Sequence, residues 1–178
     1  MFYLKSLLEF LRFLYENEAQ IDDLQFAIRL LGFSDKYLQD DLHKRCINFL
    51  KNNLTIDNVS ELIQYLDQQS TPDLELKDSA FDLIIDNATE VFQEDNMNAK
   101  FFEEFLIKNI TMDTIVKIAD ILDYPNEEIP QEKTINLRKA CFEFARKNFK
   151  SLHEKNIPEE FSKAFLSGVI LYMAETQK

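Results

Sequence analysis

Carboxylates are the most abundant side chains in this sequence that could do acid–base chemistry. Pairs of identical neighbouring acids occur at Asp22-Asp23, Asp40-Asp41, Glu103-Glu104, Glu127-Glu128 and Glu159-Glu160. Neighbours on a helix point about 100° apart, so two adjacent carboxylates do not converge on one reacting atom. We therefore interpret these pairs as parts of solvated helix faces.

Metal sites and catalytic motifs have little support. His43 and Cys46 lie three positions apart, but a structural zinc site needs four ligands, and no second pair has matching spacing. The stretch Asp67 to Asp78 has the length of an EF-hand loop, yet Pro72 stands where that loop needs glycine. No nucleophile-elbow or phosphate-loop motif is present. We expect no metal, no cofactor and no enzymatic activity.

A basic segment is the best surface candidate for a partner. The chain has 32 acidic and 20 basic residues and a net charge of -12, which disfavours nucleic acid and anionic lipid as general partners. The segment 138–150 reverses this balance, because a single acid, Glu143, faces five basic residues: Arg138, Lys139, Arg146, Lys147 and Lys150. It would dock an acidic protein tail or nucleic acid. The alternative is a solvated face balanced by the acidic segment 113–132.

Composition predicts helices joined by short turns. Hydrophobic residues make up 46% of the 178 residues, and only 2 glycines and 4 prolines are present, which leaves little material for tight hairpins. The uncharged stretch Ala164 to Ala174 is 11 residues long, about half of a membrane span, and we interpret it as a buried helix. The N-terminus lacks the features of a secretory signal. Two cysteines without a disulfide framework favour a reducing compartment, the cytoplasm or the nucleus.

Internal repeats indicate how the helices are organised. A nine-residue phrase runs from Phe49 to Asp57 and recurs from Phe105 to Asp113, 56 positions later. A second pattern aligns three helix faces: Leu42, Cys46, Leu50; Leu76, Ala80, Ile84; and Leu137, Cys141, Ala145. Repeats of this size are typical of stacked helical units. The sequence therefore predicts an all-α fold, an array of stacked antiparallel helical hairpins, with both cysteines as small core residues.

Periodicity and capping residues predict the individual helices. The N-terminal helix has one apolar face, widened by Phe13 and made of Leu4, Leu7, Leu8, Leu11, Leu14 and Tyr15. A helix from Asp23 to Leu31 is expected to stop at Gly32 through a positive φ, with Ser34 capping the next helix. Thr55 and Thr111 are the predicted N-caps of helices Ile56–Leu66 and Met112–Leu122.

Several of these segments, taken in order, match one known pattern. The runs 10–18, 31–37 and 42–46 resemble the C-terminal half of a BTB/POZ domain, whose motifs are F-L-Y-T-G-E, A-D-K-Y and L-x-x-x-C. Asn17 stands where that pattern has glycine. The runs 49–59 and 76–80 are similar to the 3-box and BACK region that follows such domains. The resemblance implies two domains, a BTB-like helical part over 1–53 and a BACK-like part with two related repeats over 54–178.

The resemblance also implies a function. BTB-BACK proteins are protein-interaction modules, often adaptors that join a target protein to a cullin-type ubiquitin-ligase scaffold. The 3-box-like helix would then supply partner contacts through Ile56, Val59, Leu62 and Ile63. A sheet-forming BTB half would be expected before Met1. The alternative is a constitutive structural subunit of a large intracellular assembly with no role in ubiquitin transfer.

Overall fold

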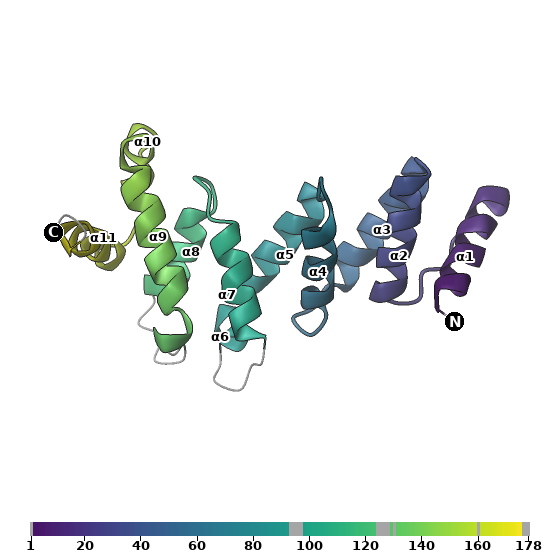
Figure 1. Ribbon diagram of the computed structural model, residues 1–178, viewed down its shortest axis with the longest axis horizontal. Coiled ribbons are helices and arrows are strands. Elements are labelled where there is room, and N and C mark those ends of the chain that lie inside the picture. The colour runs from purple at the N-terminus through teal and green to yellow at the C-terminus, as the bar shows by residue number, and fades with distance from the viewer. Residues whose placement is uncertain (1, 93–97, 124–128, 130, 160, 176–178) are drawn as a thin grey trace. The chain divides into compact units, whose positions relative to one another are not determined.

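The computed structural model of the chain describes residues 2–92, 98–123, 129, 131–159 and 161–175. These residues form helices and no strand, which confirms the predicted all-α fold (Figure 1). No helix among them is both long enough and apolar enough to cross a membrane. The helices are α1 (Phe2–Glu16), α2 (Leu24–Lys36), α3 (Asp40–Asn53), α4 (Val59–Gln68), α5 (Leu74–Asp86), α6 (Ala88–Val91), α7 (Ala99–Lys108), α8 (Ile115–Asp123), α9 (Ile135–Lys147), α10 (Phe149–Glu154) and α11 (Lys163–Glu175), with short 3-10 turns at Gln131–Lys133 and Ile157–Glu159.

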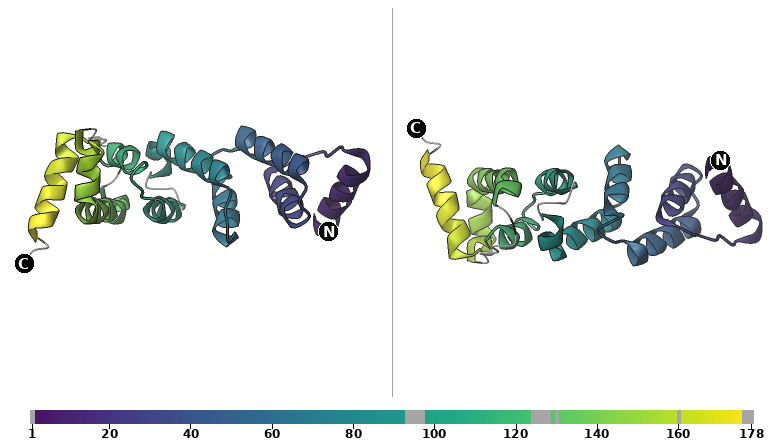
Figure 2. Two further views of the ribbon diagram at one scale, coloured as in Figure 1. Left: turned by 90° about the horizontal axis from the view of Figure 1, so that it is seen from above. Right: turned by 90° about the horizontal axis from the view of Figure 1, so that it is seen from below.

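Two compact units, Met1–Leu83 and Ile84–Lys178, divide the chain. In the first unit α2 and α3 lie side by side, and α1 packs on α2 (Figure 2). In the second unit α9 is the central helix and contacts α7, α8, α10 and α11. The division into 1–53 and 54–178, which rests on the family resemblance, stays a prediction.

The repeated helix face lies in the core at all three of its copies. Its first position, always leucine, is fully buried in Leu42, Leu76 and Leu137. Its second position, always small, is fully buried in Cys46, Ala80 and Cys141. Its third position is also buried, in Leu50, Ile84 and Ala145. The spacing of these residues, i, i+4 and i+8, places them on one side of a helix, so the repeat marks the side that packs inward.

Burial of the two cysteines predicts a loss of stability at alkaline pH. Desolvation raises the pKa of the Cys46 and Cys141 thiols to about 12. The unfolded chain releases these protons from about pH 9 upward, so folding stability falls between about pH 9 and pH 12, by about 1.4 kcal/mol per thiol and pH unit. We expect the Cys46→Ala/Cys141→Ala variant to show a shallower decline in urea unfolding free energy. Equal alkaline slopes in the variant and the parent chain would refute this.

The nine-residue phrase forms the same joint in both copies, beginning with its asparagine. The Asn53 Nδ2 donates to the Phe49 carbonyl at 2.8 Å, and the Asn109 Nδ2 donates to the Phe105 carbonyl at 2.7 Å. In each case the side-chain amide binds the backbone carbonyl four residues before it, near the C-terminal end of its helix. The sequence repeat is therefore also a repeat of hydrogen bonds.

One side chain five positions after that asparagine closes each turn. Asn58 accepts the Thr55 N–H at 2.8 Å and donates to the Asn53 carbonyl at 2.9 Å. In the second copy Thr114 accepts the Thr111 N–H at 2.8 Å, and its hydroxyl donates to the carbonyl of the preceding helix end at 2.7 Å. An amide and a hydroxyl, which can each accept and donate, thus perform the same task.

The observed starts of α4 and α8 differ from the predicted ones. Thr55 and Thr111 lie at the beginning of the turn, and their carbonyls accept the Val59 and Ile115 N–H groups at 2.9 and 3.1 Å. The Thr111 hydroxyl also accepts the Thr114 N–H at 3.2 Å, which is the predicted cap-type hydrogen bond. The helices α4 and α8 start at Val59 and Ile115, three residues later than predicted in each case. The difference in start position has a physical cause, because Asn58 and Thr114 also reach backward along the chain and hold a three-residue turn before the helix begins.

The predicted end of the second helix is also wrong. The helix α2 continues through Gly32 to Lys36, and no glycine among the described residues has a positive φ. Ser34 lies buried inside this helix, where its hydroxyl donates to the Leu31 carbonyl at 2.7 Å. A serine that satisfies its hydroxyl within the helix does not break it. The residue with the left-handed conformation is Leu38, at φ 53°.

Two side chains from other helices cap the ends of helices in the second unit. The buried Glu103 of α7 accepts the N–H groups of Asn136 and Leu137, at 3.1 and 3.0 Å, in the first turn of α9. Arg138 of α9 donates to the Leu122 carbonyl near the end of α8 at 2.6 Å. A carboxylate at a helix N-terminus and a guanidinium at a helix C-terminus both complement the helix dipole. The two contacts hold α9 against α7 and α8.

Candidate partner-binding surfaces

The side of α1 that packs on the first unit is aromatic. Phe10 is buried and stacks on Phe33 and Tyr37, with ring centroids 5.4 and 5.1 Å away. Phe13 is also buried, and the Arg45 guanidinium lies over its ring, 5.5 Å from the centroid. Offset aromatic pairs add to the free energy of burial. These contacts orient α1, and they decide which of its sides faces solvent.

The opposite side of α1 is an exposed apolar stripe. We use the name α1 stripe for Leu4, Leu8, Leu11 and Tyr15, which are 60%, 57%, 40% and 88% exposed. Their spacing of four, three and four residues places them along one line on the helix. The predicted helix is confirmed, but the prediction that these residues form its buried face is wrong. Phe13, which was predicted to widen that face, is buried, and the other buried residues on this side of α1 are Ser6 and Phe10.

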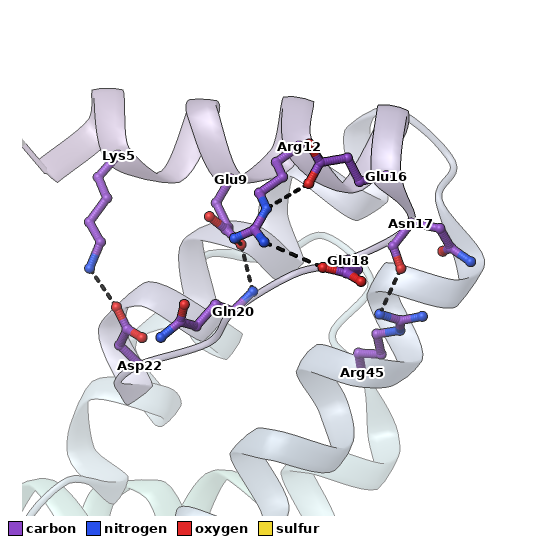
Figure 3. A network of polar contacts seen from close by, with 9 residues as sticks. All are labelled: Lys5, Glu9, Arg12, Glu16, Asn17, Glu18, Gln20, Asp22 and Arg45. Atoms are coloured by element: carbon purple, nitrogen blue, oxygen red, sulfur yellow. Dashed lines mark hydrogen bonds and ion pairs between the residues drawn. The ribbon is translucent and has the colours of Figure 1, made fainter.

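A row of charged residues runs along the edge of α1 beside the stripe. Lys5 forms an ion pair with Asp22 at 2.6 Å, and Arg12 forms one with Glu16 at 2.9 Å (Figure 3). Glu9 accepts the Gln20 backbone N–H at 2.6 Å. Exposed ion pairs of this kind contribute little to stability, because solvent and salt screen them. Their effect is local, because they bind the segment between α1 and α2 to α1 and leave the stripe free of charge.

The turn after α1 contains an asparagine in the left-handed conformation. Asn17 has φ 54°, in the left-handed region that glycine, and to a lesser degree asparagine, adopts at low cost. Its carbonyl accepts a hydrogen bond from Arg45 of α3 at 3.1 Å (Figure 3). This surface hydrogen bond links the turn after α1 to α3.

The predicted basic segment divides into a structural part and an exposed part. Arg138 is half-buried and caps α8, so its charge is used within the fold. Arg146 and Lys147 are exposed and pair with Glu143, at 3.9 and 3.5 Å. Lys150 is exposed and pairs with Glu154 at 3.9 Å, and Lys139 is exposed as well. The structure therefore leaves four of the five basic residues on the surface, Lys139, Arg146, Lys147 and Lys150.

The contacts predicted on the 3-box-like helix are not available to a partner in this structure. Val59, Leu62 and Ile63 are at most 1% exposed, and only Ile56 is half-buried. Their i, i+3, i+4 spacing is the buried side of α4, so they are core residues. A substitution there would test folding rather than binding.

Three of the residues considered for catalytic or metal-binding chemistry, Glu103, His43 and Cys46, make contacts within the fold. Glu103, predicted to be solvated, is buried and caps α9. His43 lies 3.2 Å from Asp35, and Cys46 is buried in the core. Among the described residues no group of three or more His, Cys, Asp and Glu side chains is arranged to hold a metal ion. Glu127, Glu128 and Glu160 lie outside those residues.

Sequence periodicity found α1 but missed the side of it that faces solvent. The missed signal is the narrow charged edge, since Lys5, Glu9, Arg12 and Glu16 occupy one side and leave the rest of the helix apolar. A helix that is apolar on two opposite sides is normally covered on both.

Comparison with known proteins finds no family model, curated protein or solved structure that matches this chain.

Proposed function

We propose that this chain is a non-enzymatic protein-interaction module that binds a partner through the α1 stripe. The observation that carries the proposal is the exposure of three leucines and a tyrosine along one line of α1, opposite its buried side. Monomeric proteins rarely leave such a continuous apolar patch in water. The four-three-four spacing is that of a coiled-coil seam, which suits a helix of the partner.

The specific form that we propose is an adaptor between a target protein and a cullin-type ubiquitin ligase. This form is supported by the resemblance to BTB-BACK proteins in the order of their short motifs. Two separate surfaces, the α1 stripe in the first unit and the exposed basic residues of α9 and α10 in the second, are what an adaptor needs. The basic residues suit an acidic segment of the second protein.

A second candidate is a constitutive subunit of a larger assembly. The same stripe favours it, because permanent interfaces are more apolar than those that form and dissociate. The two candidates predict different companions for the chain. An adaptor co-purifies with a cullin scaffold, whereas a structural subunit co-fractionates with one stable assembly that contains no cullin.

Charge introduced into the α1 stripe is expected to remove the partner. In the Leu8→Glu/Leu11→Glu variant, two carboxylates would have to be buried in the interface, which costs several kcal/mol and lowers affinity by more than about a hundredfold. Both positions are exposed, so the fold is retained. The measurement is quantitative affinity purification of the tagged chain from its own cells, followed by size fractionation.

The control is Leu74→Glu, which places the same charge on a leucine that is 70% exposed and lies outside the stripe. We expect this control variant to retain every protein that co-purifies with the parent chain. Retention of all companions by the Leu8→Glu/Leu11→Glu variant would overturn the proposed function, and the presence or absence of a cullin decides between its two forms.

A further inference from the structure

The turn between α2 and α3 presents a leucine in an unfavourable conformation. Leu38 is 85% exposed and has φ 53°. It follows the end of α2, where the Gln39 N–H donates to the Ser34 carbonyl at 2.9 Å and closes the turn. Helices that end in this way usually have glycine at the left-handed position. Glycine would fit here with less strain, so folding alone does not explain the leucine.

Leu38 stands between two clefts of the first unit. One cleft, of about 400 Å³, lies among α2, α3 and α4, and Tyr65 is part of its wall. The other, of about 450 Å³, lies between the end of α1 and the start of α3, and Leu14 is part of its wall. Leu38 and Asp40 line both clefts. The leucine is thus an exposed apolar residue with a hollow on each side.

The charged side chains that line the two clefts are mostly acidic. One basic side chain, Arg45, lies beside the second cleft, where it donates to the Asn17 carbonyl and lies over the Phe13 ring. Asp35, Asp40 and Asp73 line the first cleft, and Asp40 and Asp41 line the second. The described residues that line them include no lysine or arginine. The net potential of this surface is therefore negative, and it attracts cationic groups.

The carboxylates differ in how far the fold already uses them. Asp35 lies 3.2 Å from His43 and accepts the Tyr65 hydroxyl at 3.4 Å. Asp73 accepts the Leu76 N–H at 2.9 Å and caps α5. Asp40 and Asp41 are exposed in the first turn of α3, and neither forms an ion pair within the described part of the chain. These two are the carboxylates left for an incoming cation.

We infer that the two clefts and Leu38 form a docking site for a basic segment of a partner protein. Leu38 packs against an apolar side chain of that segment, and Asp40 and Asp41 pair with its lysine or arginine side chains. Charge complementarity favours this occupant, since the four aspartates of the lining, Asp35, Asp40, Asp41 and Asp73, would repel an acidic segment. The site is separate from the α1 stripe and does not depend on the function proposed for it.

The test uses a fluorescein-labelled dodecapeptide in which lysine pairs alternate with leucine, measured by fluorescence anisotropy against the full chain. Salt at about 0.15 M limits the reach of general charge attraction to about 8 Å. We expect Asp40→Asn/Asp41→Asn to weaken binding about tenfold or more. The control Asp57→Asn/Asp78→Asn removes the same charge from exposed positions outside the clefts and is expected to change affinity less than about twofold.

The Leu38→Gly variant tests the role of the leucine side chain separately from that of the carboxylates. It removes the apolar contact and also relieves the left-handed strain, so binding is expected to weaken about tenfold while the thermal midpoint of unfolding rises. Equal weakening by the two charge variants would show attraction to an acidic surface in general and overturn the inference. Unchanged affinity in Leu38→Gly would overturn it as well.

Discussion

Replacing Glu103 with alanine is expected to lower the free energy of unfolding of the second unit by about 3 kcal/mol. The Glu103 side chain is only 5% exposed in α7, and it accepts three hydrogen bonds from the start of α9. Two of the donors are backbone N–H groups of the first turn, which have no partner within their own helix. Alanine leaves both N–H groups without this acceptor, the Leu137 N–H in a buried position, and removes a negative charge from the positive end of the helix.

Glu104 provides a matched control, because it is the next residue in the same helix and is exposed. We expect Glu104→Ala to change stability by about 0.5 kcal/mol or less. Glu103→Gln keeps an oxygen acceptor without the charge and is expected to fall between the two. Urea unfolding followed by circular dichroism measures all three. Equal losses in Glu103→Ala and Glu104→Ala would show that Glu103 does not act as a cap.

Alanine substitutions at the two glycines are expected to act in opposite directions. At Gly168 in α11 a methyl group would lie 2.5 Å from Cζ of Phe142, so the ring must move. That ring also contacts Phe165 and Tyr172, with centroids 5.4 and 6.0 Å apart. We expect Gly168→Ala to destabilise the second unit by about 1–3 kcal/mol.

At Gly32 in α2 a methyl group would meet nothing within 4 Å. Gly32→Ala is therefore expected to stabilise the first unit by up to about 1 kcal/mol, the difference in helix propensity. Shortening the facing ring in a Gly168→Ala/Phe142→Leu double variant is expected to recover part of the loss. Thermal unfolding of the parent chain, Gly32→Ala, Gly168→Ala and the Gly168→Ala/Phe142→Leu double variant measures these effects on stability. Alanine effects of the same sign at both glycines would contradict the packing described for α11.

The sequence predicted the parts of the fold that depend on regular spacing. Leu42, Leu76 and Leu137 could be assigned to the core because the same positions recur with the same chemistry. The helix starts were less accurate, since Asn58 and Thr114 close their turns by reaching backward. Gly32 was misread because glycine permits a positive φ but does not require one.

Contacts between distant segments could not be predicted. Glu103 is one of two adjacent glutamates in its helix, and nothing local shows that it meets a helix start more than thirty positions later. Arg138 looked like part of a binding surface for the same reason, because its partner lies on α8. Such tertiary caps depend on how helices pack, and helix packing is not encoded in the spacing of charged residues.

The α1 stripe shows a different limit. Periodicity identifies apolar sides, but it cannot choose between two of them when a helix has charge along only one edge. The choice is made by aromatic packing, because Phe10 and Phe13 find ring and cation partners and the leucines do not. The residues of the α1 stripe, which the sequence placed in the core, are therefore exposed and form the main candidate binding surface.

Photo-crosslinking from position 8 is the most direct test of the claim that this surface binds a partner. A benzophenone amino acid at Leu8, in the centre of the α1 stripe, is irradiated in the cells that make the protein, and the same group at Leu74 is the reference. We expect a specific crosslink from position 8 to the partner that co-purifies with the chain, and no such product from position 74. A partner that co-purifies but crosslinks equally from both positions, or from neither, would contradict it.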